Sequence, residues 1–124
     1  MHTCLVVDES EVIRKVAARI MFQMGMMVDG VGSAEEALQL IGNDTPPDLV
    51  IVAATLPDRP GEELVRAIRE LKGGRDPVIL ALLVDPNLGK MTRFKRAGAT
   101  GFIFKPFDRE RLTAWLAPYM GAAA

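Results

Sequence analysis

Five short and mostly apolar segments alternate with segments of helical character, and this alternation constrains the fold more than any other feature of the chain. The apolar segments cover residues 3–7, 26–31, 48–52, 78–84 and 100–104. Apolar strands that are separated by helices are typical of a parallel sheet covered on both faces. The pattern therefore predicts one α/β domain over residues 1–124, a doubly wound (βα)5 flavodoxin-like sandwich with the strand order 2-1-3-4-5.

The intervening segments carry helix signals. The predicted helices cover residues 10–25, 34–41, 61–71, 85–98 and a segment from about residue 108. In the first helix, apolar side chains recur at every fourth position: Val12, Val16, Ile20 and Met24. Ser33 and Glu36 form the pattern of a capping box at the start of the second helix. Asp85 and Pro86 are expected to start the fourth.

Composition limits the kind of protein this is. The chain has 124 residues, of which 49% are hydrophobic and 25% charged, enough to bury a core of its own. Its net charge of −1 gives no general attraction to nucleic acid or to a membrane surface. The sequence shows no leader and no apolar run near the ~20 residues that span a bilayer. We therefore expect a cytoplasmic protein with neither nucleic acid nor membrane as partner.

Three of the predicted strands end in residues that should meet at one edge of the sheet. The first strand is followed by Asp8 and Glu9, the third by Ala53, and the fifth by Lys105. In the flavodoxin-like strand order, the carboxyl ends of the first and third strands flank the point where ligands bind. The sequence thus predicts a site that is acidic on one wall, apolar on the other and touched by one ammonium group.

Several short motifs around this site occur in a recognisable order. They are Asp8-Glu9, Leu56-Pro57 followed by Gly61, Gly98-Ala99, Phe102, and Lys105-Pro106-Phe107. Together they resemble the response-regulator receiver (CheY-like) domain over almost the whole chain. The resemblance implies that an aspartate at the end of the third strand accepts a phosphoryl group, while the acidic pair holds magnesium. It also implies a threonine or serine at the end of the fourth strand.

Two of the implied positions depart from the family pattern. Ala53 replaces the phospho-acceptor aspartate, and Leu82 stands where the hydroxyl residue is expected. Alanine supplies neither a nucleophile nor a metal ligand, and leucine cannot bind a phosphoryl oxygen through a hydroxyl. The paired loss favours a natural pseudo-receiver. An ordinary phospho-receiver inactivated by an engineered Asp-to-Ala change at position 53 is an alternative.

The remaining polar groups of the pocket lead to a second expectation. Asp8, Glu9 and the Thr55 carbonyl would form at most a weak magnesium site, so we expect no cofactor, with magnesium weak or absent. Lys105 would then pair directly with Asp8 and Glu9, because a nearby cation favours the charged form of both carboxyl groups. The predicted result is a static ionic cluster in place of the metal. No enzymatic activity is expected, since neither a nucleophile–base pair nor a glycine-rich phosphate loop occurs.

A basic stretch near the C-terminus is the other uneven feature. It contains Lys90, Arg93, Lys95, Arg96, Lys105, Arg109 and Arg111, with Phe102 among them. In receivers, the fourth helix, fifth strand and fifth helix form the usual partner surface, and the first helix often receives phosphotransferases. We therefore expect a stand-alone, phosphorylation-independent pseudo-receiver of bacterial two-component-type signalling that contacts a histidine kinase, phosphotransferase or motor-type target. The alternative is a sensor that binds an anionic nucleotide, such as a cyclic dinucleotide, on this basic face.

Overall fold

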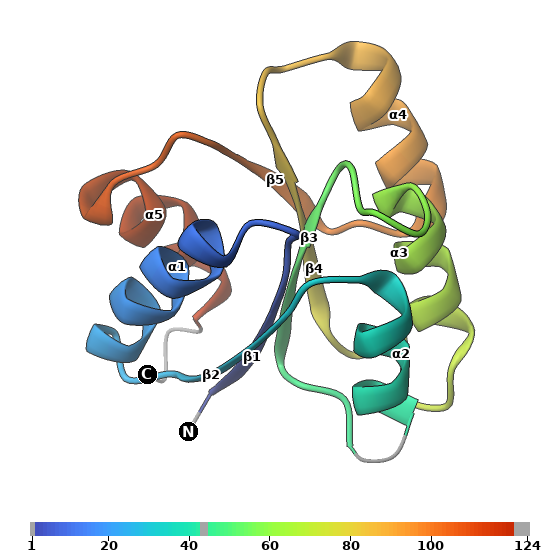
Figure 1. Ribbon diagram of the computed structural model, residues 1–124, viewed down its shortest axis with the longest axis horizontal. Coiled ribbons are helices and arrows are strands. Elements are labelled where there is room, and N and C mark those ends of the chain that lie inside the picture. The colour runs from blue at the N-terminus through green and yellow to red at the C-terminus, as the bar shows by residue number, and fades with distance from the viewer. Residues whose placement is uncertain (1, 43–44, 121–124) are drawn as a thin grey trace.

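Five parallel strands form one sheet in the order β2-β1-β3-β4-β5, as the sequence predicts (Figure 1). The structure is a computed structural model, and it describes residues 2–42 and 45–120. The strands are β1 (Thr3–Val7), β2 (Met27–Val31), β3 (Leu49–Ala53), β4 (Val78–Leu83) and β5 (Gly101–Phe104). The flavodoxin-like α/β architecture is therefore confirmed.

Helices cover both faces of this sheet. They are α1 (Glu11–Gln23), α2 (Ala34–Gly42), α3 (Gly61–Glu70), α4 (Leu88–Ala97) and α5 (Arg109–Leu116), followed by a 3-10 turn, η1 (Ala117–Tyr119). Figure 1 shows α1 and α5 on one side of the sheet and α2, α3 and α4 on the other. In the part of the chain that the structure describes, none of these helices is long and apolar enough to cross a bilayer.

The two layers of helices enclose two cores that share the central strands. β3 is buried at every position. Because successive side chains of a strand point to opposite faces, Leu49 and Ile51 join the core under α1 and α5. Val50 and Val52 join the core under the other three helices. This two-sided burial explains why the strand is apolar throughout.

The apolar residues of α1 do not all face the core. Val12 is 69% exposed and Val16 is 41% exposed, whereas Ala17, Ile20 and Met21 are buried. A spacing of four residues turns by about 40° per step around a helix of 3.6 residues per turn, so a row at that spacing drifts away from the buried face. The helical segment was correctly predicted, but its first two apolar positions lie on the surface.

The start of α4 also differs from the prediction. The helix begins at Leu88, where the Asn87 side chain accepts a hydrogen bond of 3.0 Å from the Lys90 amide. Asp85 instead belongs to a turn in which its carbonyl accepts the Asn87 amide. Asparagine is as good an N-cap residue as aspartate, and the sequence-based prediction passed over Asn87. Every other predicted end lies within two residues of the observed one.

Candidate functional site

The fold brings the predicted acidic and basic residues together at the carboxyl ends of the strands. Asp8 follows β1 and is 3% exposed. Lys105 follows β5, 97 residues away in sequence, and its Nζ lies 2.9 Å from Oδ2 of Asp8. The side chain of Lys105 is 23% exposed, so this ion pair is largely shielded from water. The predicted contact between Asp8 and Lys105 is therefore present.

Both oxygens of the Asp8 carboxylate have hydrogen-bond donors. Oδ2 binds Lys105, and Oδ1 accepts the amide of Ser10 at 2.8 Å. Glu9 does not share the pair: its side chain is exposed, and among the described residues no ion pair joins it to Lys105. The expectation that Lys105 pairs with both acids was therefore wrong for Glu9. Adjacent residues at a strand end point in different directions, and here only the first points inward.

Arg14, in the first turn of α1, forms hydrogen bonds with the backbone of the loop that contains Asp8 and Glu9. Its Nη1 donates to the carbonyl oxygens of Asp8 at 2.8 Å and Glu9 at 3.1 Å. The side chain also lies against β2 and the segment after it, where a Cβ on Gly30 would meet Arg14 Cδ at 3.3 Å. Arg14 was not singled out from the sequence, because nothing in its position signals a bond back to the preceding loop.

The apolar wall of the site is formed by β3 and β4. The register of the sheet pairs Ala53 with Leu82, and the Ala54 amide donates to the Leu82 carbonyl at 3.0 Å. Ala53 is 2% exposed and Leu82 is 1% exposed. The two predicted departures from the family pattern thus lie side by side on neighbouring strands, and both side chains are buried.

As arranged in the structure, these residues offer a magnesium ion a poor set of ligands. Magnesium requires oxygen ligands in near-octahedral geometry, anchored by carboxylates. Both Asp8 oxygens already accept hydrogen bonds, the Glu9 side chain is exposed, and Ala53 offers only a methyl group. Within residues 2–42 and 45–120, no group of three or more His, Cys, Asp or Glu side chains is arranged to hold a metal ion. Thr55 alone, an exposed residue after β3, does not complete such a site.

Asp58 connects the turn after β3 to the N-terminus of α2. Its Oδ1 accepts the Ala34 amide at 3.0 Å, and its Oδ2 accepts the Glu35 amide at 2.9 Å. The carboxylate therefore caps α2 from 24 residues away, while Ser33 accepts the Glu36 amide as the capping box predicts. Asp58 was not predicted to have this role, because the cap residue comes from a distant loop.

Replacing Asp58 with alanine is expected to lower the urea midpoint at neutral pH, with an effect that fades in acid. The two amide donors hold the pKa of Asp58 below its ordinary value of 3.8. A group with a lowered folded-state pKa stabilises the fold above its unfolded-state pKa, and this stabilisation is lost as pH falls through the folded-state value. Asp58→Asn, which keeps one acceptor, is the control and should lose less. An equal loss at pH 7 and at about pH 2 would contradict the assignment.

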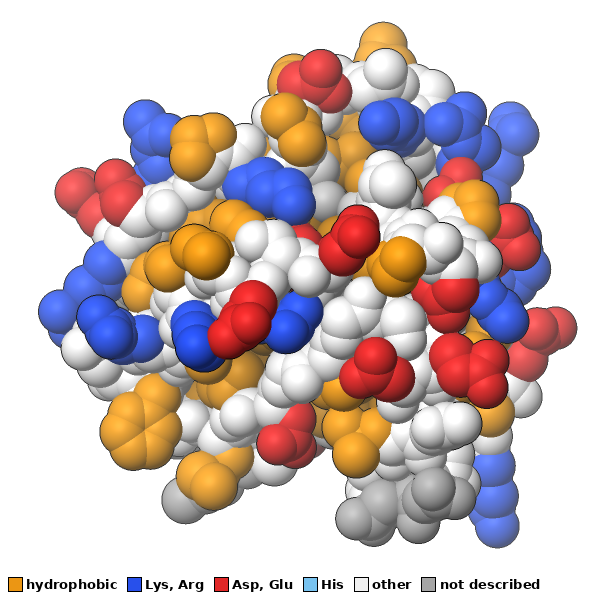
Figure 2. All heavy atoms as spheres, in the orientation of Figure 1, with side chains coloured by type: hydrophobic (Ala, Val, Ile, Leu, Met, Phe, Trp, Pro, Cys, Tyr) orange, Lys and Arg blue, Asp and Glu red, His pale blue; other side chains and the backbone are white. Residues whose placement is uncertain are grey.

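The basic residues are distributed over α4, β5 and the start of α5, and several have partners within the chain. Exposed side chains are those of Lys90, Arg93, Lys95, Arg96, Arg109 and Arg111, while Phe102 and Lys105 are half-buried. Figure 2 shows the basic side chains gathered over α4, with acidic ones close by. Arg93 Nε lies 3.0 Å from Glu62 Oε2 of α3, and Lys95 donates to the Thr100 carbonyl at 3.4 Å. The basic face is thus partly neutralised, and its use by a partner or nucleotide stays a prediction.

Comparison with known proteins agrees with this arrangement. The model of the response regulator receiver domain matches residues 4–117. Chemotaxis protein CheY of Halobacterium salinarum is 30% identical over 105 residues, which cover 85% of each chain. Response regulator MprA of Mycolicibacterium vanbaalenii is 33% identical over 110 residues, 89% of this chain but 46% of MprA. The chain thus spans about half the length of that relative.

Solved structures show the same fold in detail. CheY4 of Vibrio cholerae superposes with a TM-score of 0.90 at 29% identity, covering 96% of this chain and 98% of CheY4. The receiver domain of the sensor histidine kinase PA1611 of Pseudomonas aeruginosa gives a TM-score of 0.86 at 25% identity, covering 98% of each chain. That domain was solved with a magnesium ion coordinated in its active site cleft. The chain described here belongs to the response regulator receiver family, the receiver domains of two-component signalling.

Proposed function

We propose that this chain is a receiver that acts without being phosphorylated and signals through contact with a protein partner. One observation carries the proposal: at the end of β3, where a nucleophilic carboxylate would be required, the structure has the buried methyl group of Ala53 next to Leu82. Formation of an acyl phosphate needs a carboxylate oxygen that attacks phosphorus and a cation that offsets the phosphate charge. The first is missing at this position, and Asp8 is held by Lys105.

The same residues argue against a phosphorylation switch. A conformational equilibrium shifts only as far as a ligand or modification binds one state better than the other. A phosphoryl group in this pocket would find no hydroxyl on Leu82, and the Lys105 ammonium is already bound to Asp8. We therefore infer that the domain stays in one conformation, fixed by the Asp8–Lys105 ion pair.

The surface supports a role in docking. Receiver domains generally act in signalling and not as enzymes, and they interact with partner proteins such as histidine kinases. On α1, the exposed Val12 and Val16 lie one turn apart, so an apolar strip is open to a partner. On α4 and α5, Arg96 and Arg109 are exposed as well. We propose a histidine kinase, phosphotransferase or motor-type protein as the partner, in the cytoplasm.

Phosphorylation assays test the chemical part of the proposal. Wild-type protein incubated with acetyl phosphate and magnesium is expected to remain unmodified in intact-mass spectra. Ala53→Asp should accept phosphate poorly, and Ala53→Asp with Leu82→Thr should accept it better, because the second change restores a hydroxyl beside the carboxylate. Stable phosphate on the wild type would refute the proposal. Robust phosphorylation of Ala53→Asp alone would instead favour an ordinary receiver that an engineered change at position 53 has inactivated.

Binding assays test the docking part. Affinity for a histidine kinase or phosphotransferase of the source cell should be the same with and without acetyl phosphate and magnesium. Val12→Glu and Arg96→Glu then separate the α1 surface from the α4 surface, with Lys72→Glu as an exposed control after α3. A phosphodonor-dependent affinity would contradict the proposal, as would affinities that none of these changes alters.

A further inference from the structure

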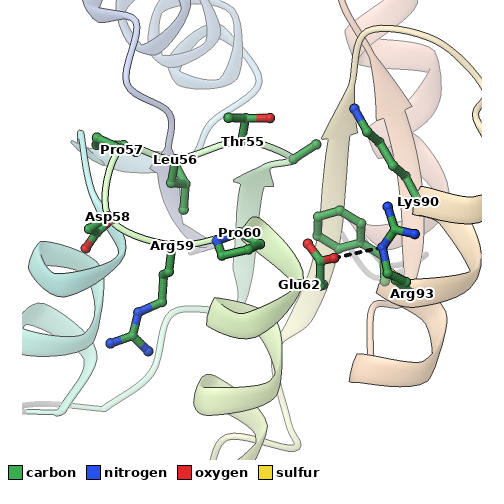
Figure 3. Close-up of a pocket in the computed structure, with 11 residues that line it drawn as sticks. Thr55, Leu56, Pro57, Asp58, Arg59, Pro60, Glu62, Lys90 and Arg93 are labelled. Carbon is green, nitrogen blue, oxygen red and sulfur yellow. Dashed lines mark hydrogen bonds and ion pairs between the residues drawn. The ribbon is translucent and has the colours of Figure 1, made fainter.

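A cleft of about 440 Å³ opens between the β3–α3 turn and α4, beside the Ala53 site (Figure 3). Its size is within the range of pockets that bind small organic molecules. The residues that line it are Ala54, Thr55, Leu56, Pro57, Asp58, Arg59, Pro60, Glu62, Lys90, Arg93 and Phe94. The side chains of Leu56 and Phe94 are buried, at 6% and 1% exposure, and give the cleft an apolar floor.

Some of the charged side chains around the cleft have partners within the chain, and others do not. Both carboxylate oxygens of Asp58 accept hydrogen bonds from amides of α2, and Figure 3 shows Asp58 and Arg59 on the side of the turn away from α4. On the α4 side, the carboxylate of Glu62 binds Arg93 Nε. The Lys90 ammonium has no ion pair or hydrogen bond with any described residue. The first turn of α4 also contains no acidic residue.

Three groups that can bind an anion therefore face one opening. An arginine has five N–H donors in a planar fork, and Glu62 accepts only the Nε hydrogen of Arg93, so both Nη groups remain available. Figure 3 shows the Lys90 side chain extending in the direction of Thr55. The Thr55 hydroxyl, like the ammonium, has no hydrogen bond to the part of the chain that the structure describes. Arginine and lysine are the usual ligands of carboxylate and phosphate groups.

We propose that this cleft binds a small organic anion, a carboxylate or phosphate attached to an apolar body. The anionic group lies between Lys90 and Arg93 with Thr55 as a further donor, and the apolar body rests on Leu56 and Phe94. The proposal does not depend on the function proposed above, because it needs neither the loss of phosphorylation nor a protein partner. It shares Lys90 and Arg93 with the predicted nucleotide surface, but it uses the side of α4 that faces α3 and does not involve Arg96.

NMR titration of the full chain with phenyl phosphate, benzoate and inorganic phosphate tests the site. We expect saturable amide shifts confined to residues 54–62 and 87–94, with a dissociation constant of about 1 mM or tighter for one of the two aromatic anions. Tighter phenyl phosphate would identify a phosphate ligand, and tighter benzoate a carboxylate ligand. Aromatic anions that bind no better than inorganic phosphate would overturn the proposal, because the apolar floor would then contribute nothing.

Three variants make the test specific. Lys90→Ala is expected to weaken binding about tenfold, because it removes an ammonium group that no described residue pairs on the α4 side of the cleft. Glu62→Gln should strengthen binding, since it removes a negative charge from the cleft and releases Arg93. Arg96→Ala, on the same helix and also exposed, is the matched control and should leave affinity unchanged. Equal losses in Lys90→Ala and Arg96→Ala, or weaker binding by Glu62→Gln, would refute the site.

Discussion

Lys105→Met is expected to lower the free energy of unfolding by about 2–3 kcal/mol. The substitution leaves the Asp8 carboxylate, 4% exposed, without its cation but still buried against the Ser10 amide. Removing one member of a buried ion pair usually costs ~3–5 kcal/mol, because the other charge stays uncompensated. We take a smaller value since Lys105 is 23% exposed and some water would reach the carboxylate. Urea denaturation at neutral pH measures the loss.

A double variant shows whether the uncompensated charge is the cause. Asp8→Asn combined with Lys105→Met removes both charges and should recover most of the stability, because neither side chain is then an unpaired ion. Lys15→Met is the matched control. It breaks a pair of similar length, 2.7 Å to Glu11, whose side chains are 76% and 65% exposed, and it should barely move the urea midpoint.

The outcome of this cycle bears directly on the proposed function. If Asp8 and Lys105 form a static replacement for a metal and phosphoryl centre, the pair should be coupled and its disruption destabilising. A neutral or stabilising Lys105→Met would mean that the lysine does not hold the acidic side chain in place. The proposal that the ion pair fixes one conformation would then fail, although Ala53 would still lack a nucleophile.

The Asp8–Lys105 contact was predictable from sequence because it follows from topology. In a parallel sheet the carboxyl ends of all strands lie on the same side, so the residues that end β1 and β5 face the same site although β3 and β4 lie between them. The long Lys105 side chain then reaches Asp8. The same rule placed Ala53 in the site. The direction of a side chain was harder to predict from the sequence. For this reason Glu9 was expected in the ionic cluster, although it points to solvent.

Contacts made by loops and helix ends could not be predicted in the same way. Arg69, at the end of α3, donates to the carbonyls of Gly98, Gly74 and Pro77 at 3.0, 3.0 and 2.7 Å. Burial lowers the pKa of its guanidinium, and these carbonyls replace the water it loses. Such bonds depend on the relative position of several elements and leave no periodic signal in the sequence. Asp58 at α2 is a second case.

Gly61→Ala should be among the most damaging single substitutions in the chain, with a loss of about 3 kcal/mol. Gly61 opens α3, and its amide donates to the Ala54 carbonyl at 3.0 Å. A Cβ at this position would overlap the carbonyl oxygen of Ala53 and would lie 2.9 Å from Phe94 Cζ. The carbonyl belongs to a buried central strand, so α3 would have to move away from β3. Gly42→Ala, where a Cβ meets nothing within 4 Å, is the control.

A second substitution separates the two clashes. Phe94→Leu in the Gly61→Ala background relieves the contact with the ring but leaves the Ala53 carbonyl where it is, so we expect little recovery in the urea midpoint. Full recovery would show that the aromatic ring, and not the backbone of β3, requires glycine here. If the β3 backbone is what requires glycine, then α3 starts in close contact with Ala53, and this contact holds the two ends of the turn over residues 54–60 in place. The same glycine then positions the turn beside the Ala53 site and one wall of the proposed anion cleft.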